Sequence, residues 1–399
     1  MSPPPAPTDA AVRAAVTLLS FGSFFGGVAL RICDGLLPRL ARDFDITAGT
    51  AGQVVISFSV AYGLSQLIFG PLGDRYGKAR IMCTALFLSA ITSLVCALAP
   101  GFDSLVWLRV LWGLSAAGVI PLSIAWVGDT VPYEQRQATL ARLMLGTLGG
   151  MTAGQLAGGV FADTPLGWRG AFVTLSVGYT IVAALLFTRL RAIPSAPAVR
   201  PQGRFGVPAQ LAAVLAIPWA RMVLLTVACE GLFLFGPIAF LPTYVHDRYG
   251  VPLSVASGLI SLFAVGGLLY AVVARRIVQR FGERRMVLAG GLIMGLGYVG
   301  WYVSPIAWLA APVAFVTGFG TYLLHNTLQT HGSQMAPQTR GTAMALFAFC
   351  FFLAQAGGVW MGAWAYDHAG AAALLLLPAA LLPLASWNFA RGLRRRAEA

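Results

Sequence analysis

The sequence predicts an all-α integral membrane protein in which twelve transmembrane helices form two pseudo-symmetric six-helix halves. Three observations predict this fold class. Hydrophobic residues fill 58% of the 399 positions and charged residues only 10%, whereas soluble domains carry about 25% charged residues. The chain divides into roughly a dozen apolar runs, each close in length to the 20 or so residues that a helix needs to cross a bilayer. The two halves also repeat one another at an offset of about 205 residues.

The predicted spans follow one another with short Gly, Pro or charged segments between them. The first span comes after the head MSPPPAPTDAAVR, which has neither the charged start nor the cleavage site of a signal peptide. We therefore expect the first span to stay in the mature protein. The spans are predicted at 15–38, 48–72, 79–100, 103–128, 139–162, 168–190, 219–245, 252–274, 286–304, 307–331, 341–366 and 369–390.

One long polar stretch, LRAIPSAPAVRPQGRFGVPAQ, separates the sixth span from the seventh. On either side of it, three segments match in the same order: GPLGDRYGKAR with RRIVQRFGERR, LLPRLARDFDI with FLPTYVHDRYG, and PYEQR with PQTR. A duplicated half is a common plan of transporters, whose substrate site lies near the midplane where the halves meet. The predicted units are a cytoplasmic tail (1–14), an N-terminal six-helix bundle (15–190), a cytoplasmic linker (191–218), a C-terminal six-helix bundle (219–390) and a basic cytoplasmic tail (391–399).

The net charge of +13 indicates topology, because the basic residues are unevenly distributed. With the amino terminus placed inside the cell, 21 of the 27 Lys and Arg residues fall on cytoplasmic segments. Membrane proteins carry this excess of basic residues on their cytoplasmic loops. We therefore predict a multi-pass plasma membrane protein, as in a bacterial inner membrane, with both termini in the cytoplasm and no nucleic-acid partner.

The reactive residue types give no sign of an enzyme. The five cysteines all fall inside predicted spans and form no CxxC pair, which is typical of small buried side chains rather than disulfides or metal ligands. HExxH, GxSxG and P-loop patterns are also absent. We expect no catalytic residue, no cofactor and no metal, and a monomer whose partners are a small-molecule substrate, protons and the lipid bilayer.

Several motifs carry a family resemblance. The loop after the second span fits the pattern GxLaDRxGrrxxl through Gly70, Leu72, Gly73, Asp74, Arg75, Gly77, Lys78 and Arg80. LRVLWG in the fourth span fits RxxxG and places Arg109 as a membrane arginine, and GDTVPYEQR after it matches an acidic, Pro, Arg exit through Asp129, Pro132 and Arg136. GMTAGQLAGG in the fifth span is similar to GxxxGPxxGG, with Gln155 in place of proline. The chain resembles the major facilitator superfamily, and within it the twelve-span drug:proton antiporters.

The resemblance implies a conformational latch at the 70–80 loop. Asp74 would interact with the positive end of the eleventh span near Gly341, and Lys78 or Arg75 would pair with Asp129. A carboxylate at a helix N-terminus is favourable by about 0.3–1 kcal/mol, so such contacts could bias an outward-open state without locking it. The latch residues would be Gly70, Asp74, Arg75, Gly77, Lys78, Asp129 and Arg136. The alternative is a plain charge cluster that sets topology.

The fifth span has glycines at every fourth position, Gly150, Gly154 and Gly158. They form one smooth helix face against which another backbone can pack. This face could serve helix packing alone or take part in coupling.

Ionisable residues inside the predicted spans are the candidates for proton coupling. Arg31 and Asp34 are three positions apart and can form an internal salt bridge that makes the first span insertable. Alternatively, Asp34 is a proton carrier, as an acid in the first span is in the resembling antiporters, with Arg109 at similar depth as a second arginine partner. Each such group costs about 2.5–3.5 kcal/mol at a helix centre and tends to face a cavity or a partner.

The second buried acid, Glu230, lies mid-way along the seventh span without a basic residue within one helical turn. Burial disfavours its charged form, which suits reversible protonation, although a permanently protonated hydrogen-bond donor is the alternative. The tenth span adds a polar stripe of Tyr322, Asn326, Gln329 and Ser333, with His325 beside it. In the family, spans one, four, seven and ten line the central cavity, so Tyr322, His325, Asn326 and Gln329 are the predicted cavity residues. His325 alone could equally be a hydrogen-bonded core residue.

The predicted function is proton-coupled export of small organic or drug-like molecules by alternating access. Two alternatives keep the same fold: a proton symporter or facilitator of a small metabolite or organic anion, and a lipid flippase. The charge of the compound that binds best separates the first alternative from export, because two arginines favour carboxylates whereas Asp34 and Glu230 favour cations or neutral compounds.

Overall fold

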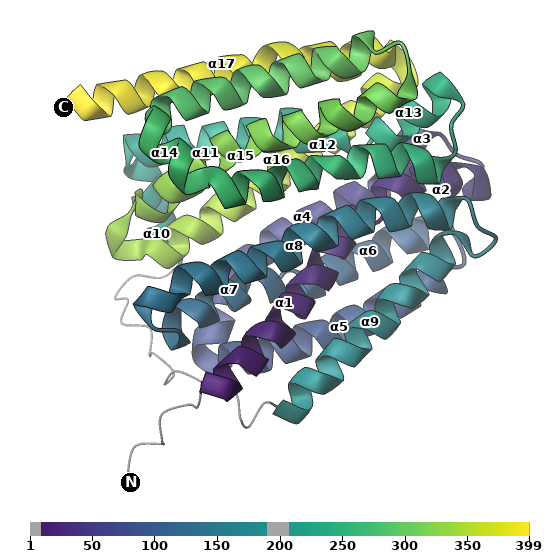
Figure 1. Cartoon of the computed structure of the whole chain (residues 1–399). Coiled ribbons are helices and arrows are strands. Elements are labelled where there is room, and N and C mark those ends of the chain that lie inside the picture. The colour runs from purple at the N-terminus through teal and green to yellow at the C-terminus, as the bar shows by residue number, and fades with distance from the viewer. Residues whose placement is uncertain (1–8, 190–206, 399) are drawn as a thin grey trace.

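The computed structural model describes residues 9–189 and 207–398, which are helical and contain no strand. The predicted units 1–14 and 191–218 thus lie partly outside the described residues. Figure 1 shows two groups of helices, the first coloured purple to teal and the second green to yellow. Helix α1 begins and helix α17 ends at the same end of the molecule (Figure 1), which we call the basic end. The other end is called the opposite end.

The first half contains six helical passes, several of them broken. The first is broken after Arg31, where the chain makes a short 3₁₀ turn and restarts with Pro38 in the first turn of the next helix, a position at which proline costs nothing. The elements are α1 (Asp9–Arg31), η1 (Asp34–Leu36), α2 (Leu37–Phe44), α3 (Ala48–Ala51), α4 (Gln53–Tyr76), α5 (Lys78–Ala97), α6 (Phe102–Ala116), α7 (Val119–Thr130), α8 (Tyr133–Ala162) and α9 (Gly167–Arg189).

The second half repeats this plan. A positive φ at Gly282 breaks α14 in two, and another at Gly370 separates η5 from α17. The elements are α10 (Val207–Ala216), α11 (Pro218–Glu230), η2 (Gly231–Phe235), α12 (Gly236–Ile238), α13 (Leu241–Tyr249), α14 (Leu253–Val303), η3 (Ala307–Leu309), α15 (Ala310–Gln334), η4 (Pro337–Thr339), α16 (Arg340–Trp364), η5 (Ala365–Ala369) and α17 (Gly370–Glu398).

Within the described residues, nine helical segments are long and apolar enough to cross a membrane. Two of them, Leu253–Val303 and Pro337–Arg396, each contain one of the glycine breaks and therefore two passes. The prediction of an all-helical membrane protein is confirmed, and the arrangement is compatible with twelve spans. The structure differs from the prediction at the linker. The last part of the predicted linker forms the helix α10, which the polar composition before it does not indicate.

The glycines of α8 allow it to pack tightly on α1. A Cβ atom added at Gly150, Gly154 or Gly158 would meet backbone atoms of Phe24, Val28 or Ile32. The glycine face predicted in the fifth span therefore lies against the first span. This packing holds the broken end of α1, with Arg31 and Asp34, against α8.

Candidate transport site

The first ion pair lies at the break in the first span. Arg31 Nη1 is 3.2 Å from Asp34 Oδ2, and the two side chains are 6% and 0% exposed. The Arg31 guanidinium also lies 4.8 Å from the ring centre of Phe235, which belongs to the other half. Asp34 Oδ1 is buried without a hydrogen-bond partner among the described residues. The internal salt bridge is therefore present, and it contacts the second half of the chain.

Arg109 is the buried cation beside this pair. Its Nε donates to the backbone carbonyl of Val54 over 3.0 Å, and its guanidinium stacks on Phe58 and Trp112 at 4.1 and 4.7 Å. Nη1 of Arg109 has no hydrogen-bond partner among the described residues. The positive charge of Arg109 acts on the Asp34 carboxylate. The structure thus places Arg109 near enough to the Arg31–Asp34 pair for its charge to act on Asp34. One carboxylate faces two arginines here.

The second ion pair lies in the other half. Glu230 ends α11, where a five-residue π-helical turn begins, and its Oε2 is 2.9 Å from Nδ1 of His325 on α15. Glu230 is fully buried, whereas the His325 side chain is 21% exposed. Glu230 Oε1 has no partner among the described residues. Such π-turns occur frequently at functional sites. The sequence placed both residues on cavity-lining spans but did not predict that they pair.

The polar stripe of α15 runs from this pair toward the basic end. Asn326 donates to the Tyr270 hydroxyl over 3.1 Å, and Tyr322 stacks on Tyr270 and lies within electrostatic reach of both Glu230 and Arg31. Along the stripe, Tyr322 and Asn326 are half-buried and Gln329 is exposed. The predicted residues Tyr322, His325, Asn326 and Gln329 therefore lie on one face, and its exposed end lies toward the basic end.

Gln155 is a site residue that the sequence did not single out for binding. It lines a cavity of about 20 Å³ together with Arg31, Ser261 and Phe263. Gln155 is 5% exposed, and its Nε2 is buried without a partner among the described residues. The only signal in the sequence was that a glutamine stands where the resembling pattern has proline. A cavity of this size accommodates about one water molecule or one small polar group.

At the basic end, Lys78 is the centre of the charge cluster. Its Nζ is 2.7 Å from Asp74 Oδ1 and 2.6 Å from Asp129 Oδ2. Arg75 lies over Tyr76, and Arg136 donates to the Val131 carbonyl. The pairing of Lys78 with Asp129 matches the expectation.

The other predicted latch contact is not made in this structure. Asp74 pairs with Lys78, and a Cβ atom at Gly341 would meet nothing within 4 Å. Gly77 makes the turn with a φ of +92°, and Gly70 has open space around it. A contact between Asp74 and the start of α16 would need the two halves to be closer together at this end.

The sequence matches a known protein family over most of its length. A sequence model of the Major Facilitator Superfamily matches residues 19–393. The chain belongs to the major facilitator superfamily. It is 26% identical over 380 residues to the inner membrane transport protein YnfM of Escherichia coli. That alignment covers 92% of this chain and 89% of YnfM. It is 29% identical over 303 residues to a chloramphenicol resistance protein of Streptomyces lividans, which covers 74% of each.

Solved structures agree on the fold. The D-xylose-proton symporter aligns with a TM-score of 0.76 and 15% identity over 95% of this chain and 96% of the other. The sequence-based expectation of a major facilitator transporter rather than an enzyme is thereby confirmed. Because the family acts on small molecules in a lipid bilayer, the chain is a multi-pass membrane transporter.

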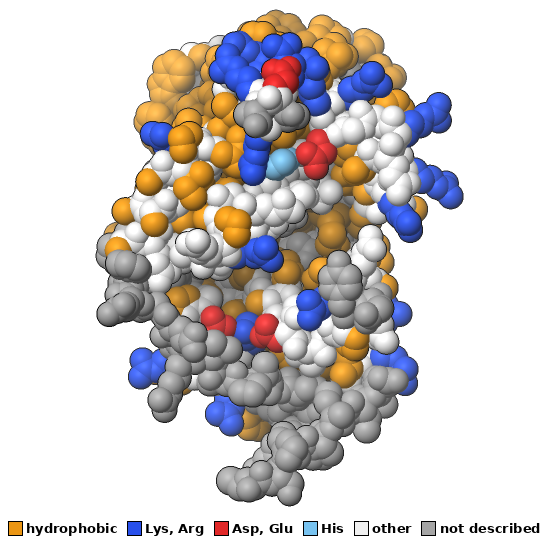
Figure 2. Space-filling view, turned by 90° about the vertical axis from the view of Figure 1, so that its left-hand side faces the viewer, with side chains coloured by type: hydrophobic (Ala, Val, Ile, Leu, Met, Phe, Trp, Pro, Cys, Tyr) orange, Lys and Arg blue, Asp and Glu red, His pale blue; other side chains and the backbone are white. Residues whose placement is uncertain are grey.

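The two ends of this major facilitator protein differ in how the halves meet. At the opposite end, Asp163 and Asp367 each accept hydrogen bonds from the other half, and at mid-depth Gln355 donates to Ser59 over 3.5 Å. Figure 2, which views the basic end, shows a recess between the halves. The halves are therefore joined by hydrogen bonds at the opposite end and separated by a recess at the basic end.

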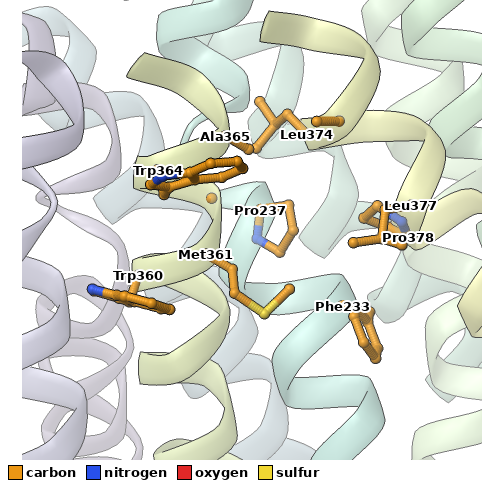
Figure 3. A pocket seen from close by; sticks show the side chains of 11 residues that line it. Phe233, Pro237, Trp360, Met361, Trp364, Ala365, Leu374, Leu377 and Pro378 are labelled. Carbon is orange, nitrogen blue, oxygen red and sulfur yellow. The ribbon is translucent and has the colours of Figure 1, made fainter. Parts of the chain in front are cut away.

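An apolar cavity in the second half is separate from the ion pairs. It measures about 340 Å³ and lies within the second half, between α12, α16 and α17 (Figure 3). Its lining is apolar, and its tryptophans Trp360 and Trp364 are 65% and 57% exposed. Exposed tryptophan rings on the outside of a membrane-spanning bundle are suited to contact with lipid. Because it is not between the halves, this cavity gives no support to a lateral path for lipid transport.

Proposed function

We propose that the protein is a proton-coupled secondary active transporter that exports small organic molecules by alternating access. The observation that carries this proposal is the pair of buried ionisable groups in opposite halves, Arg31–Asp34 and Glu230–His325. Buried charges are expensive in a membrane protein and mark transport paths or proton relays. Both pairs keep one carboxylate oxygen without a partner among the described residues.

The charges of the site balance in one protonation state. With His325 neutral, the two arginines Arg31 and Arg109 offset the two carboxylates Asp34 and Glu230. One proton taken up by the Glu230–His325 pair gives the site a net positive charge, which a poorly solvated site tolerates only at a cost. A cationic molecule therefore binds best when this proton has left, and a neutral molecule competes with the proton where both use the same carboxylate. Exchange of one proton for one substrate follows from this competition.

The direction of export rests on two inferences. The excess of Arg and Lys at the basic end favours a cytoplasmic location for that end, so the recess would receive substrate from the cytoplasm. The chloramphenicol resistance protein among the relatives supports export of a drug-like compound.

An organic anion is the second candidate substrate. Nη1 of Arg109 and Nε2 of Gln155 are buried donors without partners among the described residues. Donors of this kind favour carboxylate or carbonyl groups. An anion would bind best to the protonated site and would move with the proton, so this substrate class predicts symport instead of antiport.

Purified protein in proteoliposomes tests both possibilities. Compounds of different charge are first ranked by thermal shift, with chloramphenicol included, and the best binders are then assayed under an imposed pH gradient with a pH-sensitive dye inside. Export by antiport predicts that substrate and protons move in opposite directions, whereas symport predicts the same direction. The proposal of proton coupling fails if a binder is transported with no movement of protons.

A further inference from the structure

Two exposed aspartates join the halves at the opposite end. Asp163, after α8, accepts backbone N–H groups of Leu253 and Ser254 at the start of α14, over 3.3 and 2.7 Å. Asp367, in η5, accepts the backbone N–H of Gly49 over 3.1 Å and the Thr47 hydroxyl over 2.6 Å, at the start of α3. Each carboxylate therefore binds the first turn of a helix that belongs to the other half.

The two contacts are related by the internal repeat. Asp163 follows the fifth span and Asp367 ends the eleventh, and their binding partners begin the eighth and second spans. Both the acids and the helix starts are separated by about the 205 residues that relate the two halves in the sequence. The same contact is thus built twice, once from each half, with donor and acceptor roles exchanged. We call these contacts the Asp163 clasp and the Asp367 clasp.

Small residues let the backbones come together beside each clasp. A Cβ atom at Gly49 would collide with the Asp367 carboxylate and lie 2.7 Å from the Ala363 carbonyl. A Cβ atom at Gly35 would lie 2.5 Å from the Gly159 nitrogen and 2.6 Å from the Ser257 hydroxyl. The closed end is therefore held by close packing across the halves as well as by the two carboxylates.

We propose that Asp163 and Asp367 are positioning residues of the transport cycle, forming a two-part gate that keeps this end closed while the basic end is open. The proposal rests on the alternating movement inferred above. A carboxylate at a helix N-terminus is stabilised by the N–H groups and the helix dipole, but both aspartates are exposed to solvent. Each clasp is consequently weak enough to break in every cycle. Both clasps break in the same rigid-body movement of the halves. The effects of the two single losses on the ratio of open to closed molecules should therefore multiply when both clasps are lost.

Distances between spin labels measure the gate directly. One pair of labels, at L98C and I306C, reports the opposite end, where these side chains are 71% and 52% exposed in different halves. A second pair, at Q137C and Q338C, reports the basic end. The five native cysteines are replaced in this background. The variants are Asp163→Ala, Asp367→Ala and the double variant, with Asp103→Ala as the matched control, because Asp103 is an exposed acid at the same end in the first turn of α6.

If the two clasps form a gate, the spin-label distances should change in opposite directions at the two ends. Each alanine variant should raise the ratio of opposite-end-open to closed molecules by about two- to fivefold, and the double variant by about four- to twenty-fivefold, with shorter distances at the basic end. Asparagine variants, which keep an acceptor but lose the charge, should lie between parent and alanine. Asp103→Ala should match the parent.

Two outcomes would overturn the gate. In one, the double variant has the distances of the parent at both ends. In the other, the opposite-end distances broaden while the basic end stays unchanged, which indicates local loosening rather than alternation. Both distance measurements need neither a proton gradient nor substrate. The gate can therefore be tested even if the proposed proton coupling is wrong.

Discussion

The two buried carboxylates are partnered differently, and the difference separates their roles. Asp34 pairs with an arginine, which stays charged at any physiological pH, and has a second arginine nearby. Glu230 pairs with a histidine, which can give up its charge. Protonation of Asp34 would strand two buried cations, whereas the Glu230–His325 pair can gain or lose a proton without stranding a permanent charge. Under the proposed proton coupling, this comparison favours the Glu230–His325 pair as the place of the exchanged proton and the Arg31–Asp34 pair as a source of charge balance.

The largest expected effect on stability comes from breaking the arginine pair. Asp34→Asn leaves the Arg31 guanidinium buried without its counterion, so we expect a loss of about 3–5 kcal/mol. Thermal unfolding in detergent measures this. The double variant Arg31→Leu with Asp34→Leu removes both charges and should recover most of the stability. A loss below about 1 kcal/mol in Asp34→Asn would show that the carboxylate does not balance a buried charge.

In the second half, the substitution Glu230→Gln should leave the free energy of unfolding nearly unchanged and should remove the coupling of transport to protons. In Glu230→Gln the immediate partner His325 can be neutral, unlike Arg31, so no permanent charge loses its direct partner and stability should change by less than about 1.5 kcal/mol. Proton-driven transport in proteoliposomes should fall by at least about tenfold, which corresponds to about 1.4 kcal/mol. Glu283→Gln is the matched control, since Glu283 forms a 2.9 Å pair with His331 at the surface. Equal losses in the two variants would refute a special role of the buried pair.

A substitution at Gln155 tests whether the first half also contacts the substrate. A buried amide without a partner costs about 1–3 kcal/mol, so Gln155→Leu should raise the melting temperature. If Gln155 donates to the substrate, the same variant should bind it less tightly, by about five- to tenfold. Titration calorimetry with the best binder measures this affinity. Unchanged binding together with higher stability would make Gln155 a structural residue with an unfilled hydrogen bond.

The smallest effect on stability is expected at the basic end. The carboxylates of Asp74 and Asp129 are 50% and 37% exposed, and exposed ion pairs contribute about 0.2–1 kcal/mol. Lys78→Gln should therefore unfold within about 1 kcal/mol of the parent, in contrast to Asp34→Asn. Thermal unfolding at low and high salt measures it, and a loss as large as that of Asp34→Asn would show that the cluster is more than a screened surface pair.

Local features were predictable from the sequence, and long-range pairings were not. The apolar runs predicted the helices because a bilayer dictates both length and composition. The Arg31–Asp34 pair was predictable because three positions along a helix place two side chains on one face. Glu230 and His325 are far apart in the sequence, so only their assignment to cavity-lining spans could be inferred.

The two clasp aspartates were missed for a physical reason. Asp163 and Asp367 are exposed acids at the ends of helices, which is ordinary for a loop, and only the meeting of the two halves gives them partners. At the basic end the sequence favoured a contact between Asp74 and the eleventh span, whereas in this open arrangement Asp74 pairs with the nearby Lys78.

Proton release on substrate binding tests the central claim most directly. Purified protein in weakly buffered detergent solution, with a pH-sensitive dye, is titrated with the best neutral or cationic binder. We predict about one proton released per substrate bound by the parent and by the Arg31→Leu, Asp34→Leu double variant, and none by Glu230→Gln. Release of the same number of protons by Glu230→Gln as by the parent would contradict the assignment of the exchanged proton to the Glu230–His325 pair.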